Sequence, residues 1–216
     1  MYTPVMNENL GSNRWHVFSK KIQREVRLKG DLEYDNWVLI ETDPLVLTFC
    51  EKPKEIIYSL NGKPIKSVFD MWIKWKDGKE EFVAVNYSYE IDIDHKRHRI
   101  SAIEKVNSQR LWCEDHSILY TVNRENEIRK NQILLENKKL LLSYMSQTNK
   151  ADEEIMNAIT HKIKSGCTNL YQIENELVQF HKAKVRRLTY NFIVDGIIES
   201  NIDRIPLGRA TEVYPK

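Results

Sequence analysis

The chain has 216 residues, of which 41% are hydrophobic and 30% are charged, and its formal net charge is +2 at pH 7. This composition is ordinary for a globular protein with a hydrophobic core, and the length allows one large domain or two small ones. It excludes a polycation, so any contact with nucleic acid must come from local basic patches.

The cysteines and the apolar runs exclude further classes of protein. Cys50, Cys113 and Cys167 are far apart and form no CxxC pair. This spacing argues against a zinc site or a disulfide framework and favours reduced thiols in a cytoplasm. The first residues lack the apolar core of a signal peptide, and no apolar run approaches the length of a membrane span. We therefore expect a cytoplasmic protein with no membrane partner.

The first 145 residues alternate short strands with helices, after a polar segment at residues 1–14 that we expect to be loosely ordered. Periodicity and turn residues predict a strand at 26–28, a helix at 32–41, strands at 45–49, 56–60, 65–75 and 81–86, a helix at 92–107, strands at 111–113 and 117–122, and a helix at 127–144. Two dipeptides, Asn61-Gly62 and Asp77-Gly78, predict hairpin turns because both supply the positive φ angles that short loops need.

The central feature is the hairpin at residues 67–86. Its first strand carries Asp70 within an apolar run, and a buried carboxylate needs a partner or a metal. A strand acid facing a second strand with another acid and a lysine is the layout of a metal-dependent nuclease. The second strand has Ala84 and Asn86 where those two groups would be wanted.

The pattern of predicted elements changes after a polar joint at residues 146–150. The first predicted helix spans 152–164, a second helix begins after a cap at Thr168, and a third spans 181–194. Residues 197–199 and 212–214 could then pair as a small hairpin. Three helices and a two-stranded hairpin are the plan of a winged helix. We therefore divide the chain into domains at 1–145 and 151–216.

Several short motifs of the first domain occur in a specific order. They are Leu32-Glu33-Tyr34-Asp35, Glu41-Thr42-Asp43-Pro44, Phe49-Cys50-Glu51-Lys52-Pro53, Val68-Phe69-Asp70-Met71 and Ala84-Val85-Asn86. In this order and at these separations, over residues 14–145, they resemble TnsA, the endonuclease subunit of heteromeric bacterial cut-and-paste transposases. That family usually shows L-E-x-D, E-x-D-P, F-x-E-Q-P, P-D-F and E-V-K at the corresponding places.

The resemblance implies an α/β fold of the PD-(D/E)xK type, a restriction-endonuclease-like mixed sheet flanked by helices, with a C-terminal winged-helix domain. Such nucleases hold Mg²⁺ or Mn²⁺ between carboxylates, and a nearby lysine stabilises the charge on the phosphate. Carried over residue by residue, Glu33 and Asp70 are the catalytic, metal-binding carboxylates. Ala84 and Asn86 stand at the acid and lysine positions of the E-V-K motif.

The function implied is that of a subunit for 5′-strand cleavage at transposon ends. Its partners would be the end DNA, a DDE-type transposase subunit and an ATPase regulator in a bacterial cytoplasm. Because Asn86 replaces the motif lysine, we expect cleavage to be impaired or lost, with a scaffold role remaining and Mg²⁺ or Mn²⁺ bound only if the site is active. A lysine elsewhere, such as Lys74 or Lys105, could take over the missing role.

Two other functions stay open on the sequence. The first is a DNA-binding regulatory protein that has an inactive nuclease fold and acts through its winged helix. The second, the least favoured, is an autonomous restriction-type nuclease. The candidate surface for DNA or a partner is the third tail helix, and a solvated helix face is an equally good interpretation. Its basic residues are Lys182, Lys184, Arg186 and Arg187.

Overall fold

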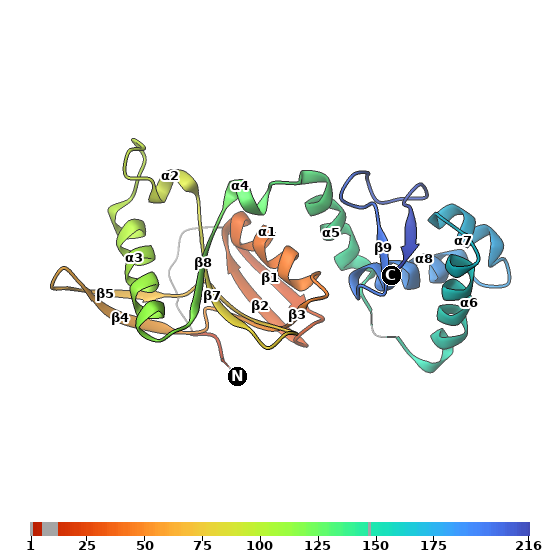
Figure 1. Ribbon diagram of the computed structural model, residues 1–216, viewed down its shortest axis with the longest axis horizontal. Helices are drawn as coiled ribbons and strands as arrows, with labels where there is room; N and C mark the ends of the chain where they lie inside the picture. Colours follow the sequence, from red (N-terminus) through yellow and green to blue (C-terminus); the bar gives the residue numbers. More distant parts are fainter. Residues whose placement is uncertain (1, 6–12, 147) are drawn as a thin grey trace. The chain divides into compact units, whose positions relative to one another are not determined.

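A four-stranded mixed sheet organises the first part of the computed structural model, which describes residues 2–5, 13–146 and 148–216 (Figure 1). The strands lie in the order β3 (Val46–Glu51), β6 (Met71–Trp75), β7 (Glu80–Asn86) and β8 (Leu119–Arg124). The first three pair antiparallel, and β8 pairs parallel to β7. The predicted α/β class with a mixed sheet is therefore confirmed.

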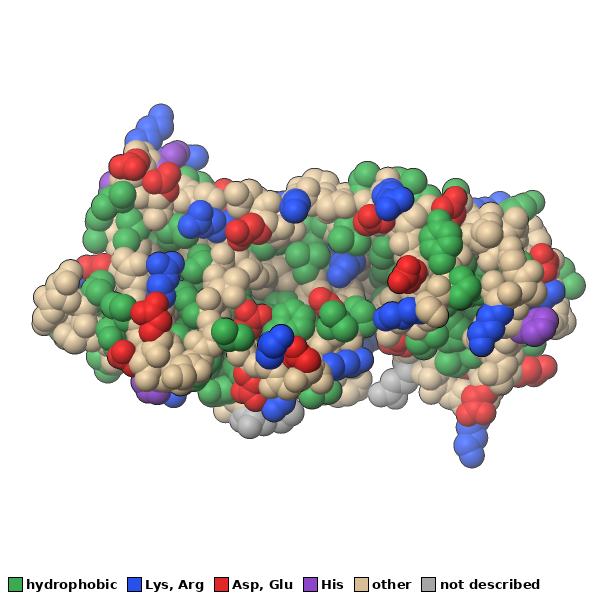
Figure 2. All heavy atoms as spheres, viewed as in Figure 1, with side chains coloured by type: hydrophobic (Ala, Val, Ile, Leu, Met, Phe, Trp, Pro, Cys, Tyr) green, Lys and Arg blue, Asp and Glu red, His purple; other side chains and the backbone are tan. Residues whose placement is uncertain are grey.

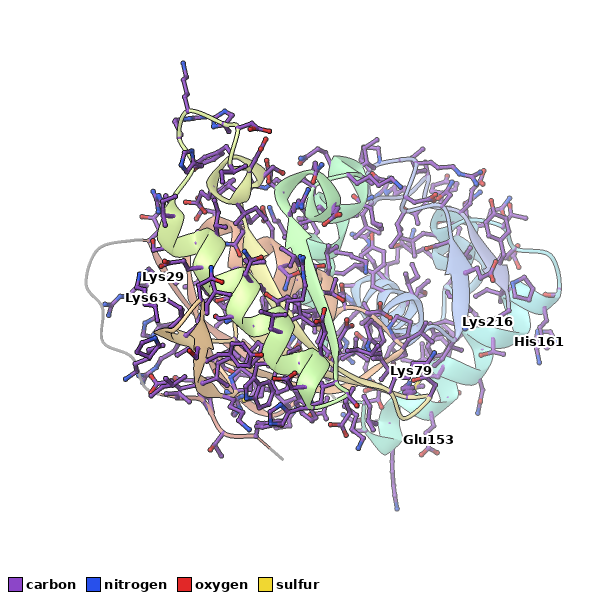
Figure 3. The ribbon with its side chains drawn as sticks, turned by 60° about the vertical axis from the view of Figure 1, so that its left-hand side comes forward. Lys29, Lys63, Lys79, Glu153, His161 and Lys216 are labelled. Atoms are coloured by element: carbon purple, nitrogen blue, oxygen red, sulfur yellow. The ribbon has the colours of Figure 1, made fainter. Side chains whose placement is uncertain are left out.

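Two antiparallel ribbons accompany this sheet. One joins β1 (Arg14–Ser19) to β2 (Arg24–Lys29), and the other joins β4 (Glu55–Leu60) to β5 (Lys63–Val68). The predicted turn between β4 and β5 is confirmed, since Asn61 and Gly62 have φ angles of 51° and 78°. Figure 3 labels two residues beside the hairpin turns: Lys63, the first residue of β5, and Lys79, which directly precedes β7.

Helices flank the sheet of the first unit. The helix α1 (Gly30–Glu41) contacts β1, β2, β3 and β7, while α3 (Ile100–Asp115) contacts β4, β5, β7 and β8. Two short helices, α2 (Ser88–Ile91) and α4 (Glu125–Ile128), follow β7 and β8. The crossover through α3 allows β8 to run parallel to β7, which a tight turn cannot do.

The strand predicted at residues 111–113 is wrong, because these residues belong to α3. Trp112 and Cys113 are buried in one cluster with Phe69 and Phe82, so the short apolar run covers the sheet from a helix. A three-residue apolar run has no periodicity that separates a strand from a helix. The helix predicted at 92–107 likewise begins later, at Ile100.

The single strand predicted at residues 65–75 is divided into β5 and β6 at Phe69 and Asp70. Up to Val68 the chain pairs with β4. The Asp70 N–H then donates to the Val83 carbonyl at 3.1 Å, so the chain changes its pairing partner to β7. The break places Asp70 directly before β6.

The chain divides by its internal contacts into two compact units. The first is Met1–Glu41 with Leu45–Lys130, and the second is Thr42–Pro44 with Asn131–Lys216. The predicted helix at 127–144 is interrupted after α4 and resumes as α5 (Gln132–Tyr144), which belongs to the second unit. The reason is packing, because Leu141 of α5 is buried in the core of that unit.

The second unit contains η1 (Lys150–Asp152), α6 (Glu153–Lys164), α7 (Leu170–Glu176), α8 (Lys182–Val194), β9 (Ile198–Ser200) and β10 (Val213–Pro215). The predicted pairing of the last two strands is confirmed. The cap of α7 is Asn169 rather than Thr168, because the Asn169 side chain accepts the Gln172 N–H at 3.0 Å. The isoleucines at 155, 159 and 163 line one buried helix face, as their spacing of four predicts.

Some predictions fall partly outside the described residues. Residues 6–12 belong to the predicted polar N-terminal segment, and residue 147 belongs to the predicted joint.

Among the described residues, a search of the helices finds none with the length and apolarity needed to cross a membrane.

The core of the second unit gives a first test. Ile159 has 0% relative exposure, so Ile159→Ala should destabilise the fold by about 2–5 kcal/mol through lost burial and a residual cavity. Urea unfolding followed by circular dichroism measures this. The matched control is Ile133→Ala, since Ile133 is 41% exposed on α5 and should shift the midpoint little. Equal effects of the two substitutions would contradict the packing described.

Candidate functional site

Asp70 is the most constrained residue of the candidate site. Its side chain is 5% exposed, and its Oδ2 accepts the Val85 N–H at 2.9 Å. Its carbonyl accepts the Lys52 N–H at 3.0 Å. These bonds hold the carboxylate between the end of β3 and the strand β7, next to the E-V-K-like positions.

Glu33 reaches the same place from α1. It lies in the first turn of the helix, where its Oε2 accepts the N–H of Lys29 at 2.8 Å. A glutamate that bonds back to the residue before its helix stabilises the helix start. Its other oxygen, Oε1, points to Lys52. The side chain is 14% exposed, so the alternative of a freely solvated surface acid does not describe it.

Lys52 joins the two carboxylates. Its Nζ lies 2.7 Å from Glu33 Oε1 and 2.7 Å from Asp70 Oδ1. The residue follows β3 directly and is the fourth residue of the motif Phe49-Cys50-Glu51-Lys52-Pro53, where the resembled family has glutamine. The sequence prediction missed this residue, although a charged residue in place of a neutral one within a recognised motif was a usable signal.

Lys105 of α3 completes the cluster. Its Nζ lies 3.0 Å from Oδ1 and 2.8 Å from Oδ2 of Asp70. Of the two lysines proposed as replacements, only Lys105 makes this contact. Lys74 instead pairs with Glu80 at 2.8 Å. The residues Glu33, Asp70, Lys52 and Lys105 are called the carboxylate–lysine cluster below.

The electrostatics of the cluster follow from its two positive and two negative groups. Burial alone would raise the pKa of Asp70, but the ammonium groups of Lys105 and Lys52 outweigh it and hold that pKa well below its usual range. Burial alone would lower the pKa of Lys52, but the charges of Asp70 and Glu33 outweigh it and raise that pKa. The cluster thus pairs two carboxylates with two ammonium groups, and their formal charges cancel.

The second strand supplies no charge to the site. Ala84 has 0% exposure and offers only backbone groups. Asn86 is buried at the end of β7, and its Oδ1 has no hydrogen-bond partner among the described atoms. An amide can accept or donate a hydrogen bond but cannot replace a lysine charge.

The residues of the cluster do not fit a divalent metal ion as they are arranged. Mg²⁺ favours several oxygen ligands in octahedral geometry, with water completing the shell. Among the described residues, no group of three or more His, Cys, Asp or Glu side chains converges on one point. The two carboxylates that do converge already share the Lys52 ammonium, which a metal ion would have to displace.

The basic residues of α8 contact polar or acidic side chains of their own unit, and Lys184, Arg186 and Arg187 form ion pairs there. Lys184 and Arg187 lie 3.1 Å and 3.2 Å from Asp152 Oδ1. Arg186 makes two bonds to the buried carboxylate of Glu174, at 2.7 Å and 3.1 Å. Lys182 Nζ donates to Asn175 Oδ1 at 2.8 Å. The residues predicted to contact DNA or a partner thus connect α8 to η1 and to α7.

The sequence was compared with protein-family models and with curated proteins, and neither comparison finds a match. The case for function therefore rests on the motifs and on the geometry of the carboxylate–lysine cluster.

The substitution Asp70→Asn tests the electrostatics of the cluster. It removes the charge that compensates Lys52 and Lys105, and breaking a buried ion pair in this way costs about 3–5 kcal/mol of unfolding free energy. Urea unfolding at pH 7 measures the loss. Asp77→Asn is the control, because that carboxylate lies in the exposed turn before β7 and should matter little.

The stability difference between wild type and Asp70→Asn should depend on pH. Because the folded-state pKa of Asp70 is depressed, its contribution is present above the pKa of an unfolded aspartate, about 4, and is lost as the pH falls through the folded-state pKa. The stability difference between wild type and Asp70→Asn should therefore narrow below about pH 4. A difference that stays constant from pH 7 to pH 3 would contradict this account.

Proposed function

We propose that this chain is a TnsA-like subunit of a heteromeric DNA transposase, in which a restriction-endonuclease-like domain has impaired or lost cleavage. One observation carries the proposal. Glu33 from a helix and Asp70 from the start of a strand converge beside β7, which is the arrangement of carboxylates that the motif order implies. Glu33 and Asp70 are far apart in the sequence, so their approach at the motif positions supports the proposal.

The loss of cleavage is supported by what surrounds Asp70. Ala84 stands at the acid position of the E-V-K motif, and Asn86 stands at its lysine position. The space between Glu33 and Asp70 holds the ammonium group of Lys52. Phosphodiester cleavage of this type needs a metal ion to polarise the phosphate and a cation to stabilise its charge. The role left to the subunit is to position the transposon ends and the DDE-type transposase for the partner's cut.

The second unit supports a docking module of the winged-helix type. Its helices α6, α7 and α8 precede the strand pair of β9 and β10. Since the basic side chains of α8 are paired within the unit, we assign the module to a protein partner rather than to tight DNA binding. On the face shown in Figure 2, basic and acidic side chains are interspersed, which also favours protein contact. The alternative of a regulator acting through this module alone is less favoured for the same reason.

A second candidate is a subunit that still cleaves, with Lys105 in the role of the motif lysine. The contact of Lys105 with both oxygens of Asp70 favours it. A lysine that approaches from α3 would reach the same carboxylate as a lysine on β7. The two candidates differ in the fate of the transposon 5′ ends.

An end-cleavage assay separates the candidates. The full-length chain is mixed with its cognate transposase, end DNA and Mg²⁺ or Mn²⁺, and both strands are mapped. We expect no 5′-strand cleavage above the level of Asp70→Asn, while 3′-strand cleavage by the transposase requires the chain to be present. Ala84→Glu combined with Asn86→Lys and Lys52→Gln restores the family pattern and should restore 5′ cleavage.

The outcomes are distinct. If wild type cuts the 5′ strands and both Asp70→Asn and Lys105→Gln abolish the cut, the cleaving subunit is correct and our proposal is wrong. If the transposase cuts equally well without the chain, and the chain binds neither the transposase nor the ends, the assignment to a transposase fails altogether.

A further inference from the structure

The ammonium group of Lys52 stands where two converging carboxylates would otherwise share a cation. It makes 2.7 Å contacts to one oxygen of Glu33 and one oxygen of Asp70. We propose that Lys52 is a built-in substitute for the metal ion, so that the site is held together permanently and does not take up a divalent cation. This deepens the proposed function, because it gives the physical reason for the loss of cleavage at the same site.

The backbone of Lys52 is itself fixed next to Asp70. Its N–H donates to the Asp70 carbonyl at 3.0 Å, and its carbonyl accepts the Val5 N–H at 2.8 Å. Its φ angle of 43° lies in the left-handed region, which costs an ordinary residue about 1–2 kcal/mol. The backbone bonds therefore keep the Cα of Lys52 beside Asp70, and the two ion pairs hold its ammonium group within the cluster.

The charge of the cluster leads to the same conclusion. Two carboxylates alone carry a charge of −2 and would attract a divalent cation. With Lys52 and Lys105 in contact the sum is zero, and Asp70 has its two oxygens engaged by the lysines and by the Val85 N–H. A metal ion would therefore meet no net attraction. It would also have to displace the Lys52 ammonium group, and the two positive charges would then repel each other at short distance.

The arrangement also explains how the fold tolerates a buried aspartate. Asp70 is 5% exposed, and an uncompensated carboxylate at that depth is strongly unfavourable. The two lysines come from the end of β3 and from α3, while Glu33 comes from α1. The ion pairs thus connect α1, the end of β3, the residue before β6 and α3.

A Mn²⁺ titration tests the substitution. Purified full-length wild type, Lys52→Gln and the control Lys74→Gln are titrated with MnCl₂, and binding is followed by electron paramagnetic resonance of the free ion. Glutamine keeps the length and polarity of the side chain and removes its charge. Lys74 is a matched control because its ammonium group pairs with Glu80 instead.

We expect wild type and Lys74→Gln to show no saturable binding in the millimolar range. Lys52→Gln should bind Mn²⁺ more tightly than wild type does, by roughly 100-fold or more, because a positive unit charge about 4 Å from the ion has been removed. This binding should disappear in Lys52→Gln combined with Asp70→Asn. Saturable binding by wild type that Asp70→Asn abolishes would overturn the proposal, and so would a folded Lys52→Gln variant that binds no better than wild type.

A thermal-unfolding cycle gives a readout that needs no metal. In wild type, Glu33→Gln should lower the unfolding temperature, because Lys52 loses a counter-charge. In Lys52→Gln, the same substitution should leave it unchanged or raise it, because Glu33 then faces Asp70 without an ammonium group between them. The same loss of stability in both backgrounds would contradict the proposal.

If Lys52→Gln does not fold, the wild-type titration alone decides, by the presence or absence of an Asp70-dependent Mn²⁺ site. The result is also separable from the proposed function. Mn²⁺ binding by wild type overturns the substitution and leaves a transposase subunit intact, whereas failure to join the transposase overturns the subunit and leaves the Lys52 contacts unchanged.

Discussion

The burial of one carboxylate, that of Asp70, is the constraint on which the first unit depends. A charge at that depth must be compensated, and the chain supplies two ammonium groups and one backbone N–H for this purpose. Each donor comes from a different element, so the position of α3, the end of β3 and the strand β7 are all tied to the same side chain. The helix α1 joins through Glu33 and Lys52.

In the function that we propose, this arrangement separates the shape of a nuclease site from its chemistry. In the subunit that we propose, the carboxylates of the helix and the strand remain because they are counter-charges for lysines, and removing either takes a counter-charge from Lys52. In the same proposal, the residues that would perform chemistry without stabilising the fold, the second acid and its lysine, are replaced by Ala84 and Asn86. A subunit that is needed for assembly rather than cleavage would be expected to keep the first pair and lose the second.

The sequence predicted those features that depend on local rules. The turn at Asn61-Gly62, the pairing of β6 with β7 and the isoleucine face of α6 all follow from turn chemistry and periodicity, and all are confirmed. The strand predicted at 111–113 was wrong because three apolar residues carry no period. The break before β6 was also missed, since a change of pairing partner from β4 to β7 depends on contacts distant in sequence.

The candidate site shows the same limit. The approach of Glu33 to Asp70 could be predicted from the motif order, and Lys105 was one of two lysines considered. The role of Lys52 could not be derived from strand parity, because the residue lies just beyond β3 with a left-handed backbone. The basic residues of α8 were predicted as a surface for DNA or a partner, but their acidic partners on α7 and before α6 are close only in the folded chain.

The central claim is that an ammonium group replaces the metal ion between Glu33 and Asp70. Anomalous diffraction from crystals grown with MnCl₂ tests it most directly, because manganese is identified by its scattering. The account predicts Lys52 Nζ within hydrogen-bond distance of both carboxylates and no anomalous peak between them. A manganese peak coordinated by Glu33 and Asp70, with Lys52 turned away, would contradict it.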